Sequence, residues 1–402
     1  MHHTPRAPYR LAAPLLALTA ALAGCGGGSS DSGGGTTPPT PTQQIDVAFT
    51  SPSDANNVHD INTPVYLEVR VDVNGNPAAN NTPVAFSGGA ASFAPVQAMT
   101  IGGKATTTFQ GNQVGPLQVQ ATATVSNQSR SGSRTLYIRP KREPLEVLVP
   151  AYFSPGKNSP WDTLVSSAKS YPDVRITAIL NPNDGIFTKE DTKFTEAITA
   201  FKAQGGKVIG YVSTAYGNGK RTVADVKANI DAYRTYYPAI DGIFLDEMAS
   251  STNRLDFYRE IYSYIKGLDA TLRVVGNPGT FPAAAYAGVA NALVTFEGKE
   301  EKYRSINPQL DQDTGAAHTW VYDRANTAQV MLAHNATTCT AMQNAVKTAD
   351  LARTNAGVVY VTDLEYDYAT DTGNAWATLP TYWSQLLGTV DAINKSRALP
   401  SC

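Results

Sequence analysis

The sequence predicts an α/β fold, a closed (β/α)8 barrel of the TIM type, preceded by an all-β sandwich. Three observations support this prediction. Short runs of alternating apolar and polar residues, separated by turn signals, fill residues 45–138. After a charged junction, residues 145–362 alternate between apolar runs of strand length and amphipathic segments of helix length. There are eight such runs in about 250 residues, which matches the strand count of a closed barrel.

Residues 1–25 have the pattern of an export signal. Arg6 and Arg10 precede an apolar run, Leu11–Ala21, that is too short to span a membrane. The run is followed by Leu22-Ala23-Gly24-Cys25, which resembles a bacterial lipobox. That resemblance implies cleavage before Cys25 and lipidation of its thiol. We therefore expect an exported protein, anchored by lipid to the membrane of the bacterial cell envelope, at the outer membrane or the cell surface.

The charge balance limits the classes of binding partner, and the cysteine count indicates whether a disulfide can form. The chain has 32 Lys and Arg against 34 Asp and Glu, with no basic cluster in its folded part, so we expect no nucleic-acid partner. With Cys25 lipidated, Cys339 and Cys402 are the remaining cysteines, and export places them in an oxidising compartment. We predict a Cys339–Cys402 disulfide that holds the C-terminal tail, the alternative being two free thiols.

Residues 26–44 and 45–140 form the next two predicted units. The first is rich in Gly, Ser, Thr and Pro, which predicts a disordered linker. In the second, runs such as Val65–Val71 and Leu117–Val125 alternate strictly, and Asn74–Pro77 is a tight-turn tetrapeptide. Strict alternation buries one face of each strand, so a β-sandwich of roughly a hundred residues follows.

Two neighbouring segments of this sandwich carry a resemblance. Val71–Pro77 and Thr82–Ser87 are similar to the bacterial immunoglobulin-like repeats of adhesins. The resemblance implies a spacer or binding module rather than a catalytic domain.

The junction Pro140–Pro144 separates the sandwich from the predicted barrel domain, residues 145–402. We expect the barrel strands at Leu145–Phe153, Val174–Leu180, Lys207–Ser213, Ile240–Leu245, Leu272–Val275, Ala292–Phe296, His318–Tyr322 and Gly357–Thr362. A doubly wound open sheet is the alternative. It usually carries a Gly-rich phosphate loop after its first strand, and this sequence has none there.

Two adjacent carboxylates end the fourth predicted strand. The run Ala239–Leu245 has no helical spacing and stops at Asp246 and Glu247, while Glu297 ends the sixth strand. The carboxyl ends of barrel strands face one common mouth, where such enzymes place their chemistry. Neighbouring residues on a strand point to opposite faces, so Asp246 and Glu247 both face the mouth only if the strand has turned. A helix N-cap or surface turn is the alternative interpretation of this pair.

Further polar and aromatic residues lie at or near the other strand ends. As substrate-binding candidates we take Tyr152, Asn181, Asn183, Tyr211, Tyr216, Asn277, Tyr322, Asp363 and Glu365. Amides and carboxylates bind sugar hydroxyls, and aromatic faces stack on pyranose rings, so these residues indicate a polysaccharide. Two of the three acids would supply the acid and the nucleophile or base of glycoside hydrolysis. The alternative is that each acid pairs with a Lys or Arg of the barrel.

Other chemistries lack their motifs. The chain has no paired-His metal motif and no Gly-x-Ser-x-Gly elbow, and Cys339 has no base near it in sequence. His318 begins a predicted strand and His334 lies in a helix-like segment, and we expect structural roles for both. We therefore expect no metal and no other cofactor.

Three segments in the predicted barrel carry a family resemblance. Ala178–Gly185, Val208–Gly217 and Asp241–Glu247 are similar, in order and spacing, to the spherulin-4 family, and Pro150–Phe153 with Trp161 fits its opening strand. The resemblance covers residues 145 to about 387. It implies (β/α)8 enzymes of glycoside hydrolase family 135, similar to the hydrolase that cuts fungal galactosaminogalactan and related to the hydrolase domain of bacterial Pel systems. It also implies an endo-acting cut at α-1,4-linked galactosamine or N-acetylgalactosamine, without a metal.

The resemblance places the family's Asp-Glu pair on Asp246 and Glu247, and its third acid on Glu297. We expect Asp246 to act as nucleophile or water-activating base and Glu297 as acid, with Glu247 supporting; Glu247 and Glu297 could exchange roles. Whether the anomeric configuration is retained or inverted stays open at this point. The lipid anchor and the immunoglobulin-like module leave the polymer open as well, as a self-made biofilm exopolysaccharide or a competitor's matrix.

The sequence thus predicts a monomeric, surface-anchored endo-glycosidase of an amino-sugar exopolysaccharide. The alternative function is a lectin or adhesin whose barrel only binds polysaccharide. A purely structural surface module is a third possibility, but it would not explain the acids at the strand ends.

Overall fold

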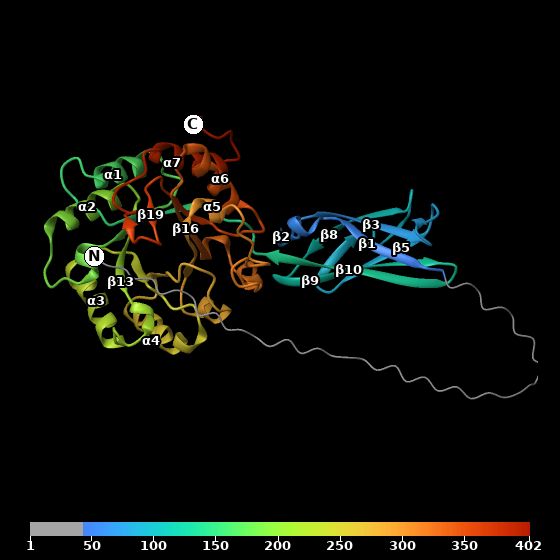
Figure 1. Ribbon diagram of the computed structural model, residues 1–402, viewed down its shortest axis with the longest axis horizontal. Helices are drawn as coiled ribbons and strands as arrows, with labels where there is room; N and C mark the ends of the chain where they lie inside the picture. The colour runs from blue at the N-terminus through green and yellow to red at the C-terminus, as the bar shows by residue number, and fades with distance from the viewer. Residues whose placement is uncertain (1–42) are drawn as a thin grey trace, which may run out of the picture.

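The computed structural model describes residues 43–402 and consists of an all-β part joined to a barrel (Figure 1). The predicted signal, the lipidation site Cys25 and nearly all of the predicted linker lie outside the described residues. Within residues 43–402 no helix is long and apolar enough to cross a membrane.

The all-β part contains two five-stranded sheets. The first has the order β1-β3-β8-β6 with β4 paired to β3, and its strands are β1 Ile45–Ser51, β3 Val65–Val73, β4 Asn76–Pro77, β6 Ala91–Ala94 and β8 Lys104–Gly111. The second has the order β2-β10-β9-β5-β7, and its strands are β2 Val58–Asp60, β5 Pro83–Gly88, β7 Gln97–Met99, β9 Gly115–Val125 and β10 Gln128–Arg139.

Alternation in the sequence explains why these strands pack face to face. Along β3 every second side chain is buried, including Leu67, Val69 and Val71, and along β9 the same holds for Val119 and Ala121. These side chains belong to one apolar cluster between the sheets. The all-β prediction is confirmed, while the immunoglobulin-like resemblance stays a prediction.

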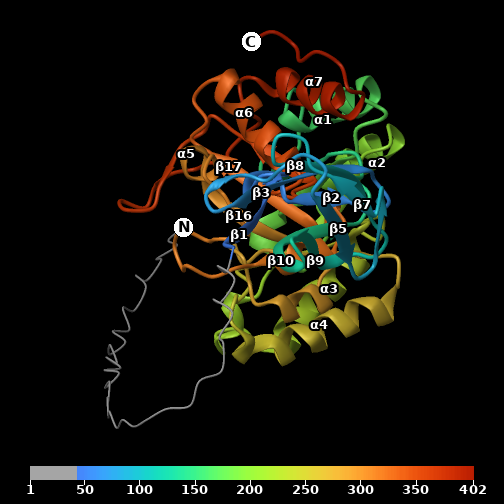
Figure 2. The same cartoon turned by 90° about the vertical axis from the view of Figure 1, so that its right-hand side faces the viewer.

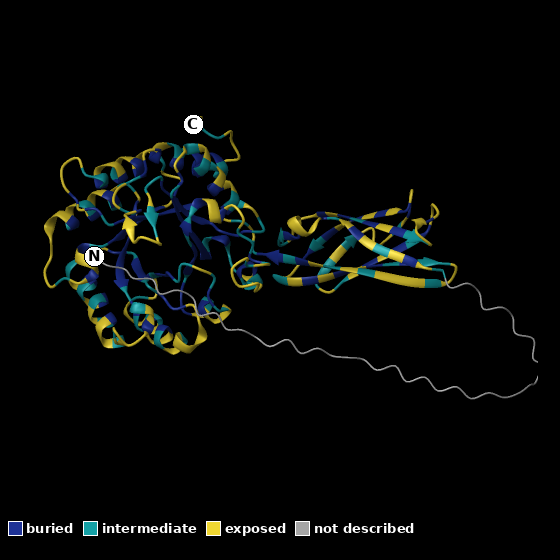
Figure 3. Cartoon of the chain, viewed as in Figure 1, coloured by how far each residue is buried: buried dark blue, intermediate teal, exposed yellow. Residues whose placement is uncertain are grey.

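The C-terminal part is a closed barrel of eight parallel strands. The strands, in barrel order, are β11 Glu146–Ala151, β12 Ile176–Leu180, β13 Lys207–Ser213, β14 Gly242–Asp246, β15 Arg273–Gly276, β16 Ala292–Lys299, β17 Gln329–His334 and β18 Val358–Val361. They are almost entirely buried, and the helices around them expose their outer faces (Figure 3). The predicted barrel is therefore confirmed.

Helices of unequal length connect the strands. The α-helices are α1 Pro160–Ser170, α2 Thr192–Ala203, α3 Val223–Tyr236, α4 Leu255–Leu268, α5 Glu300–Tyr303, α6 Cys339–Asp350 and α7 Trp383–Asn394. The 3-10 turns are η1 Asp54–Asn56 in the all-β part and η2 Pro182–Gly185, η3 Ala215–Gly217, η4 Thr252–Arg254, η5 Ala284–Gly288, η6 Thr319–Asp323 and η7 Asn326–Ala328 in the barrel. Contrary to the expected regular alternation, only η5 connects β15 to β16, and short turns with α5 connect β16 to β17.

The seventh strand differs from the prediction. We expected it at His318–Tyr322, but this segment forms η6, and the strand is β17, Gln329–His334. The expectation was wrong because Val321 and Tyr322 are apolar for another reason: they pack against Val58 of the sandwich. The true strand was read as helix-like because Met, Leu and Ala favour helices, and a strand buried on both faces shows no alternation.

The sandwich docks at the end of the barrel where the strands begin, as the view from the sandwich side shows (Figure 2). Tyr137 of β10 packs on Tyr322 of η6, with ring centroids 5.1 Å apart. The side chains of Asn57 and Gln309 exchange hydrogen bonds of 2.9 and 2.6 Å. Nη1 of Arg139, at the end of β10, donates a 3.1 Å hydrogen bond to Oδ1 of Asn355 in the barrel. The opposite end of the barrel, where the strands finish, is therefore left free by the sandwich.

The predicted Cys339–Cys402 disulfide is present. It ties the C-terminal tail to the first residue of α6, and the Nε2 atom of Gln343 donates a 2.8 Å hydrogen bond to the carbonyl of Pro400 in the same tail. The prediction from cysteine count is confirmed.

Candidate active site

Asp246 is the last residue of β14, and the chain turns immediately after it. Glu247 has a φ of +51°, in the left-handed region that residues other than glycine rarely adopt. Because the strand has ended, Asp246 and Glu247 are not held on opposite faces. Both carboxylates accept hydrogen bonds from hydroxyls of β13: Asp246 from Tyr211 at 2.8 Å, and Glu247 from Ser213. The condition under which both acids face the mouth is thus met.

A buried pair of hydroxyls holds this turn. The side chain of Thr214, fully buried, lies 2.9 and 2.8 Å from the carbonyl oxygens of Asp246 and Glu247. Its Oγ1 atom is also 3.0 Å from the hydroxyl of Tyr258, which accepts a hydrogen bond from the backbone N–H of Ala249. A strained backbone persists only where its surroundings fix it, and these contacts supply that restraint.

The side chain of Asn277 connects Asp246 to Glu297. Its Nδ2 atom donates to Oδ1 of Asp246 at 2.7 Å and to Oε2 of Glu297 at 2.6 Å. Its Oδ1 atom accepts from the N–H of Gly279 at 3.0 Å, and this bond requires the NH₂ group to face the two acids. The carbonyl of Gly279 in turn accepts from the N–H of Glu297 at 3.0 Å.

The electrostatics of the two bridged acids differ from those of surface carboxylates. Burial, and then the negative charge of Asp246, raise the pKa of Glu297 to about 7, although the hydrogen bond from Asn277 opposes the change. Burial also raises the pKa of Asp246, against the hydrogen bonds from Tyr211 and Asn277. Lys and Arg are not among the leading causes of either shift within residues 43–402. Near neutral pH, Glu297 can therefore hold a proton.

Two predicted aromatic residues lie beside these acids. Tyr152 follows β11, and its ring meets that of Tyr211 edge to face at a centroid distance of 5.5 Å. Burial and then the charges of Asp246 and Glu297 raise its pKa. Tyr216 in η3 is 53% exposed, and burial of its hydroxyl with the charges of the three acids raises its pKa to about 12. Both tyrosines are placed to contact a ligand at the acids.

The predicted asparagines at the end of β12 have different environments. Asn181 is half-buried, and its Oδ1 atom has no hydrogen-bond partner. Asn183, with a φ of +47°, donates from Nδ2 to the carbonyl of Ile186 at 2.5 Å. The side chain of Asn183 therefore holds its own loop, while Asn181 retains an acceptor.

The remaining predicted residues do not all belong to the mouth. Tyr322 is fully buried at the opposite end of the barrel, so the prediction that it contacts substrate was wrong, for the same reason as the misplaced strand. Asp363 accepts hydrogen bonds from the backbone and the hydroxyl of Thr381 and holds the segment before α7. Glu365 is exposed in the loop after β18. His318 pairs with Asp311 and stacks on Phe281, consistent with a structural role.

Sequence reasoning missed a group of residues on the side of the mouth formed by β16 and β17. His334 ends β17, and Tyr368 and Trp376, both C-terminal to β18, pack around its ring. The error in the seventh strand hid His334. The alternating aromatics at Tyr366 and Tyr368, followed by a turn, were the signal that could have indicated a hairpin there.

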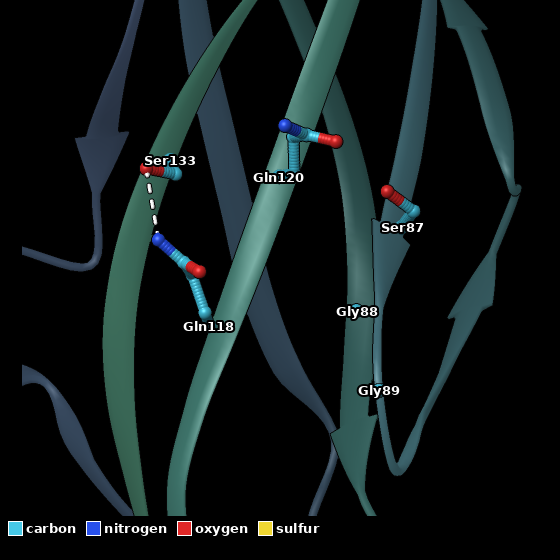
Figure 4. A pocket seen from close by; sticks show the side chains of 6 residues that line it. All are labelled: Ser87, Gly88, Gly89, Gln118, Gln120 and Ser133. Carbon is cyan, nitrogen blue, oxygen red and sulfur yellow. Dashed lines mark hydrogen bonds between the residues drawn. The ribbon is translucent and has the colours of Figure 1, made fainter.

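Two surface pockets lie away from these acids. One, of about 440 Å³, lies on the outer face of β5, β9 and β10 and is lined by Ser87, Gly88, Gly89, Gln118, Gln120 and Ser133 (Figure 4). It has no titratable side chain. The other, of about 640 Å³, lies where the barrel strands begin, and its charged residues include Glu146, which pairs with Arg175 and Arg273. Within residues 43–402, no group of three or more His, Cys, Asp or Glu side chains is arranged to hold a metal ion.

Comparison with known proteins identifies relatives of the barrel. Residues 146–390 match the model of spherulation-specific family 4. The chain is 33% identical to spherulin-4 of Physarum polycephalum over 260 residues, which cover 63% of this chain and 72% of that protein.

Solved structures with a similar arrangement were also found. The structure of Sph3 from Aspergillus clavatus in complex with GalNAc has 24% identity and a TM-score of 0.48, covering 62% of this chain and 98% of that one. A family 39 glycoside hydrolase from Bacteroides cellulosilyticus has 12% identity and a TM-score of 0.40, covering 87% and 83%. On the strength of the family match and of the spherulin-4 relative, this chain belongs to spherulation-specific family 4.

Proposed function

We propose that the protein is an endo-acting glycoside hydrolase that cleaves an amino-sugar exopolysaccharide. One observation carries the proposal: Asp246 and Glu297 share the amide of Asn277 at the mouth of the barrel, and burial with the charge of Asp246 raises the pKa of Glu297. Two buried carboxyl groups this close destabilise each other's charged forms. Such an arrangement is typical of a site that needs one proton donor and one carboxylate.

The environments of the two acids suggest their roles. Glu297, with a pKa raised to about 7, is the general acid that protonates the glycosidic oxygen as the bond from C1 to that oxygen breaks. Asp246 receives hydrogen bonds from Tyr211 and Asn277, which favour its ionised form, and it supplies the carboxylate that attacks C1. Water then attacks C1, its proton passes to Glu297, and Asp246 is released as carboxylate. Glu247, held by Ser213, supports this pair.

The close approach of the two acids is compatible with retention of the anomeric configuration, which we propose. Their nearest oxygens are at most about 5.3 Å apart, because both lie within 2.7 Å of the same nitrogen. Retaining enzymes have carboxyl groups roughly 5–5.5 Å apart, whereas inverting enzymes leave about 6.5–9.5 Å for a water molecule.

The substrate follows from the family resemblance and is supported by charge. The resemblance implies an α-1,4-linked polymer of galactosamine or N-acetylgalactosamine. Three acids, Asp246, Glu247 and Glu297, lie together at the mouth, and a polymer with some free, protonated amines suits such a site. We further propose that the protein works as a monomer, anchored to the cell envelope by lipid on Cys25, and acts on biofilm matrix.

Product release from a purified, partly N-acetylated α-1,4-linked galactosamine polymer tests the proposal. The protein from Gln44 onward is compared with its Asp246→Asn and Glu297→Gln variants and with Glu301→Gln, which changes an exposed acid on α5. We expect oligosaccharides from the parent and from Glu301→Gln, and none from the two mouth variants. A parent that binds the polymer without cutting it would support the lectin alternative. A parent that neither cuts nor binds it would contradict the proposed substrate class.

A further inference from the structure

A small hairpin follows the last barrel strand and carries an exposed tyrosine. Strands β19 (Tyr366–Asp367) and β20 (Thr372–Gly373) pair antiparallel after β18. Tyr368 lies between them and is 44% exposed, one of the few large aromatic side chains so exposed among residues 43–402. Burial of an aromatic ring stabilises a protein, so an exposed ring that is held in one position indicates a role in binding.

The ring of Tyr368 is held in place from behind. Its hydroxyl lies 3.0 Å from Nε2 of His334, a side chain that is only 1% exposed. The ring of Tyr366 meets it edge to face at a centroid distance of 4.8 Å. The ring of Trp376 meets the ring of His334 edge to face, with ring centroids 6.1 Å apart. Tyr368 is therefore fixed in one orientation although much of its surface faces solvent.

The hairpin itself is fastened to the end of β17. The Oδ1 atom of Asn335 accepts a 3.0 Å hydrogen bond from the N–H of Tyr366, and the N–H of Asn335 donates to the carbonyl of Leu364 at 3.0 Å. Oδ1 of Asn335 also contacts Nδ1 of His334. Asp367 approaches Lys299 at the end of β16, with Nζ and Oδ1 4.0 Å apart. The tyrosine thus rests on a network that joins two barrel strands.

The register of the barrel places this network next to Glu297. Glu297 of β16 pairs with Leu332 of β17. Two residues further along both strands, toward the mouth, Lys299 pairs with His334. Residues two apart on a strand share a face, so Glu297, Lys299 and His334 lie on the same side of the sheet. Partial burial and the charge of Glu297 raise the pKa of Tyr368, which agrees with this proximity.

Tyr216 occupies a different part of the mouth. It follows β13, whereas the hairpin follows β18, and these strands are three positions apart around the barrel. The charge of Glu297 contributes to raising the pKa values of both tyrosines. Two exposed aromatic rings therefore lie near Glu297, one after β13 and the other after β18.

We propose that Tyr368 is a sugar-stacking platform, a binding subsite for one pyranose ring of the polymer on the Glu297 side of the acids, opposite Tyr216. The inference rests on the proposed function, because it assumes a chain of pyranose rings crossing the mouth. A preorganised ring binds a sugar face without the entropic cost of first fixing a flexible side chain. The hairpin β19–β20 is then a determinant of which stretch of polymer is held.

The test compares Tyr368→Ala and Tyr368→Phe with Tyr66→Ala, which removes a 54% exposed tyrosine from β3 of the sandwich. Each variant of the full chain is assayed for kcat and KM on size-fractionated α-1,4-linked galactosamine oligosaccharides, and for polymer affinity by calorimetry in the Asp246→Asn background. For long oligosaccharides we expect Tyr368→Ala to raise KM roughly tenfold with little change in kcat, because stacking is lost. Tyr66→Ala should resemble the parent, and Tyr368→Phe, which keeps the ring but loses the contact of the hydroxyl with His334, should lie between the parent and Tyr368→Ala.

The outcomes separate this inference from the proposed function. If the parent cuts the polymer and Tyr368→Ala behaves like Tyr66→Ala in KM and affinity, the subsite is refuted and the glycosidase stands. If the parent does not cut but binds, and Tyr368→Ala weakens that binding, the subsite stands and the glycosidase falls. If affinity is the same in all variants, Tyr368 is not a platform.

Discussion

Asp246 and Glu297 accept hydrogen bonds from one nitrogen atom, Nδ2 of Asn277, although they belong to strands that are not neighbours. Strand β15 lies between β14 and β16 in the barrel, and Asn277 is the first residue after it. The ends of three consecutive strands, β14, β15 and β16, thus carry an acid, an amide and an acid side by side. The shared amide donor explains how the two carboxyl groups can remain close together.

Replacing Asn277 by Ala should change the pH dependence of both acids. The hydrogen bonds from Asn277 lower the pKa values of Asp246 and Glu297, so their loss raises both. We expect kcat/KM to fall by roughly 10- to 100-fold and both limbs of its pH profile to move to higher pH. A profile that keeps its position would show that Asn277 does not tune these groups.

Activity of the parent should decline as pH rises through about 7, because Glu297 then loses the proton that it donates. The pH profile of kcat/KM of the parent should therefore have an alkaline limb near pH 7, and Glu297→Gln should release no product at any pH. A parent that keeps full activity well above pH 7 would contradict the role of Glu297 as the acid.

The stability of the folded protein should also depend on the ionisation of Glu297. The pKa of Glu297 is raised above its ordinary value of 4.5, so the folded protein favours the neutral form and loses stability as pH rises from there through about 7. Above pH 7, the free energy of unfolding of Glu297→Gln in a denaturant titration should therefore exceed that of the parent by about 3 kcal/mol. At pH 4 the two should differ little. Equal behaviour of the two proteins at every pH would argue against a buried, ionisable Glu297.

Tyr211→Phe removes one hydrogen bond and keeps the ring. Its hydroxyl donates to Asp246 and lowers the pKa of that acid, so the variant should shift the acidic limb of kcat/KM upward and reduce kcat roughly tenfold. The ring contacts with Tyr152 and Phe244 should preserve the fold, which circular dichroism can check. An unchanged acidic limb would mean that Asp246 is not the ionising group.

Thr214→Val should disturb the turn after β14 without touching substrate. The hydroxyl contacts the carbonyls of Asp246 and Glu247, which also accept backbone hydrogen bonds from the N–H groups of Thr214 and Tyr216, so loss of the hydroxyl should cost about 0.5–1.5 kcal/mol. We expect kcat to fall more than KM rises, and Thr214→Ser, which keeps the hydroxyl, to restore most of the activity. If Thr214→Val kept the activity and Thr214→Ser lost it, the methyl group rather than the hydroxyl would be the important feature.

Cys402→Ser should lower stability and leave catalysis intact. The disulfide closes a loop of 63 residues of sequence separation, and its loss should cost roughly 2–4 kcal/mol in thermal or denaturant unfolding. The tail lies beside α6, and none of its contacts reach Asp246 or Glu297. Adding reductant to the parent should reproduce the loss, while having no effect on the variant.

The sequence alone determined the class of fold and several of the site residues. The hydrophobic periodicity distinguishes the sandwich from the barrel. Strict alternation indicates strands buried on one face, as in the sandwich, and continuous apolar runs indicate strands buried on both faces, as in the barrel. Asp246 and Glu297 could be found because barrel strands end at a common mouth, and the disulfide because few cysteines remained to pair. These are local or arithmetic features, which a linear sequence contains.

Tertiary structure alone decided the rest. The left-handed turn at Glu247 and the bridge through Asn277 depend on contacts between strands that are distant in sequence. Tyr322 lies in a segment that resembles a strand, yet it packs against the sandwich. His334 ends a barrel strand, β17, although the residues of that strand favour a helix. An apolar or aromatic residue in a sequence predicts burial or stacking. Which residue it then contacts depends on the packing of the whole chain.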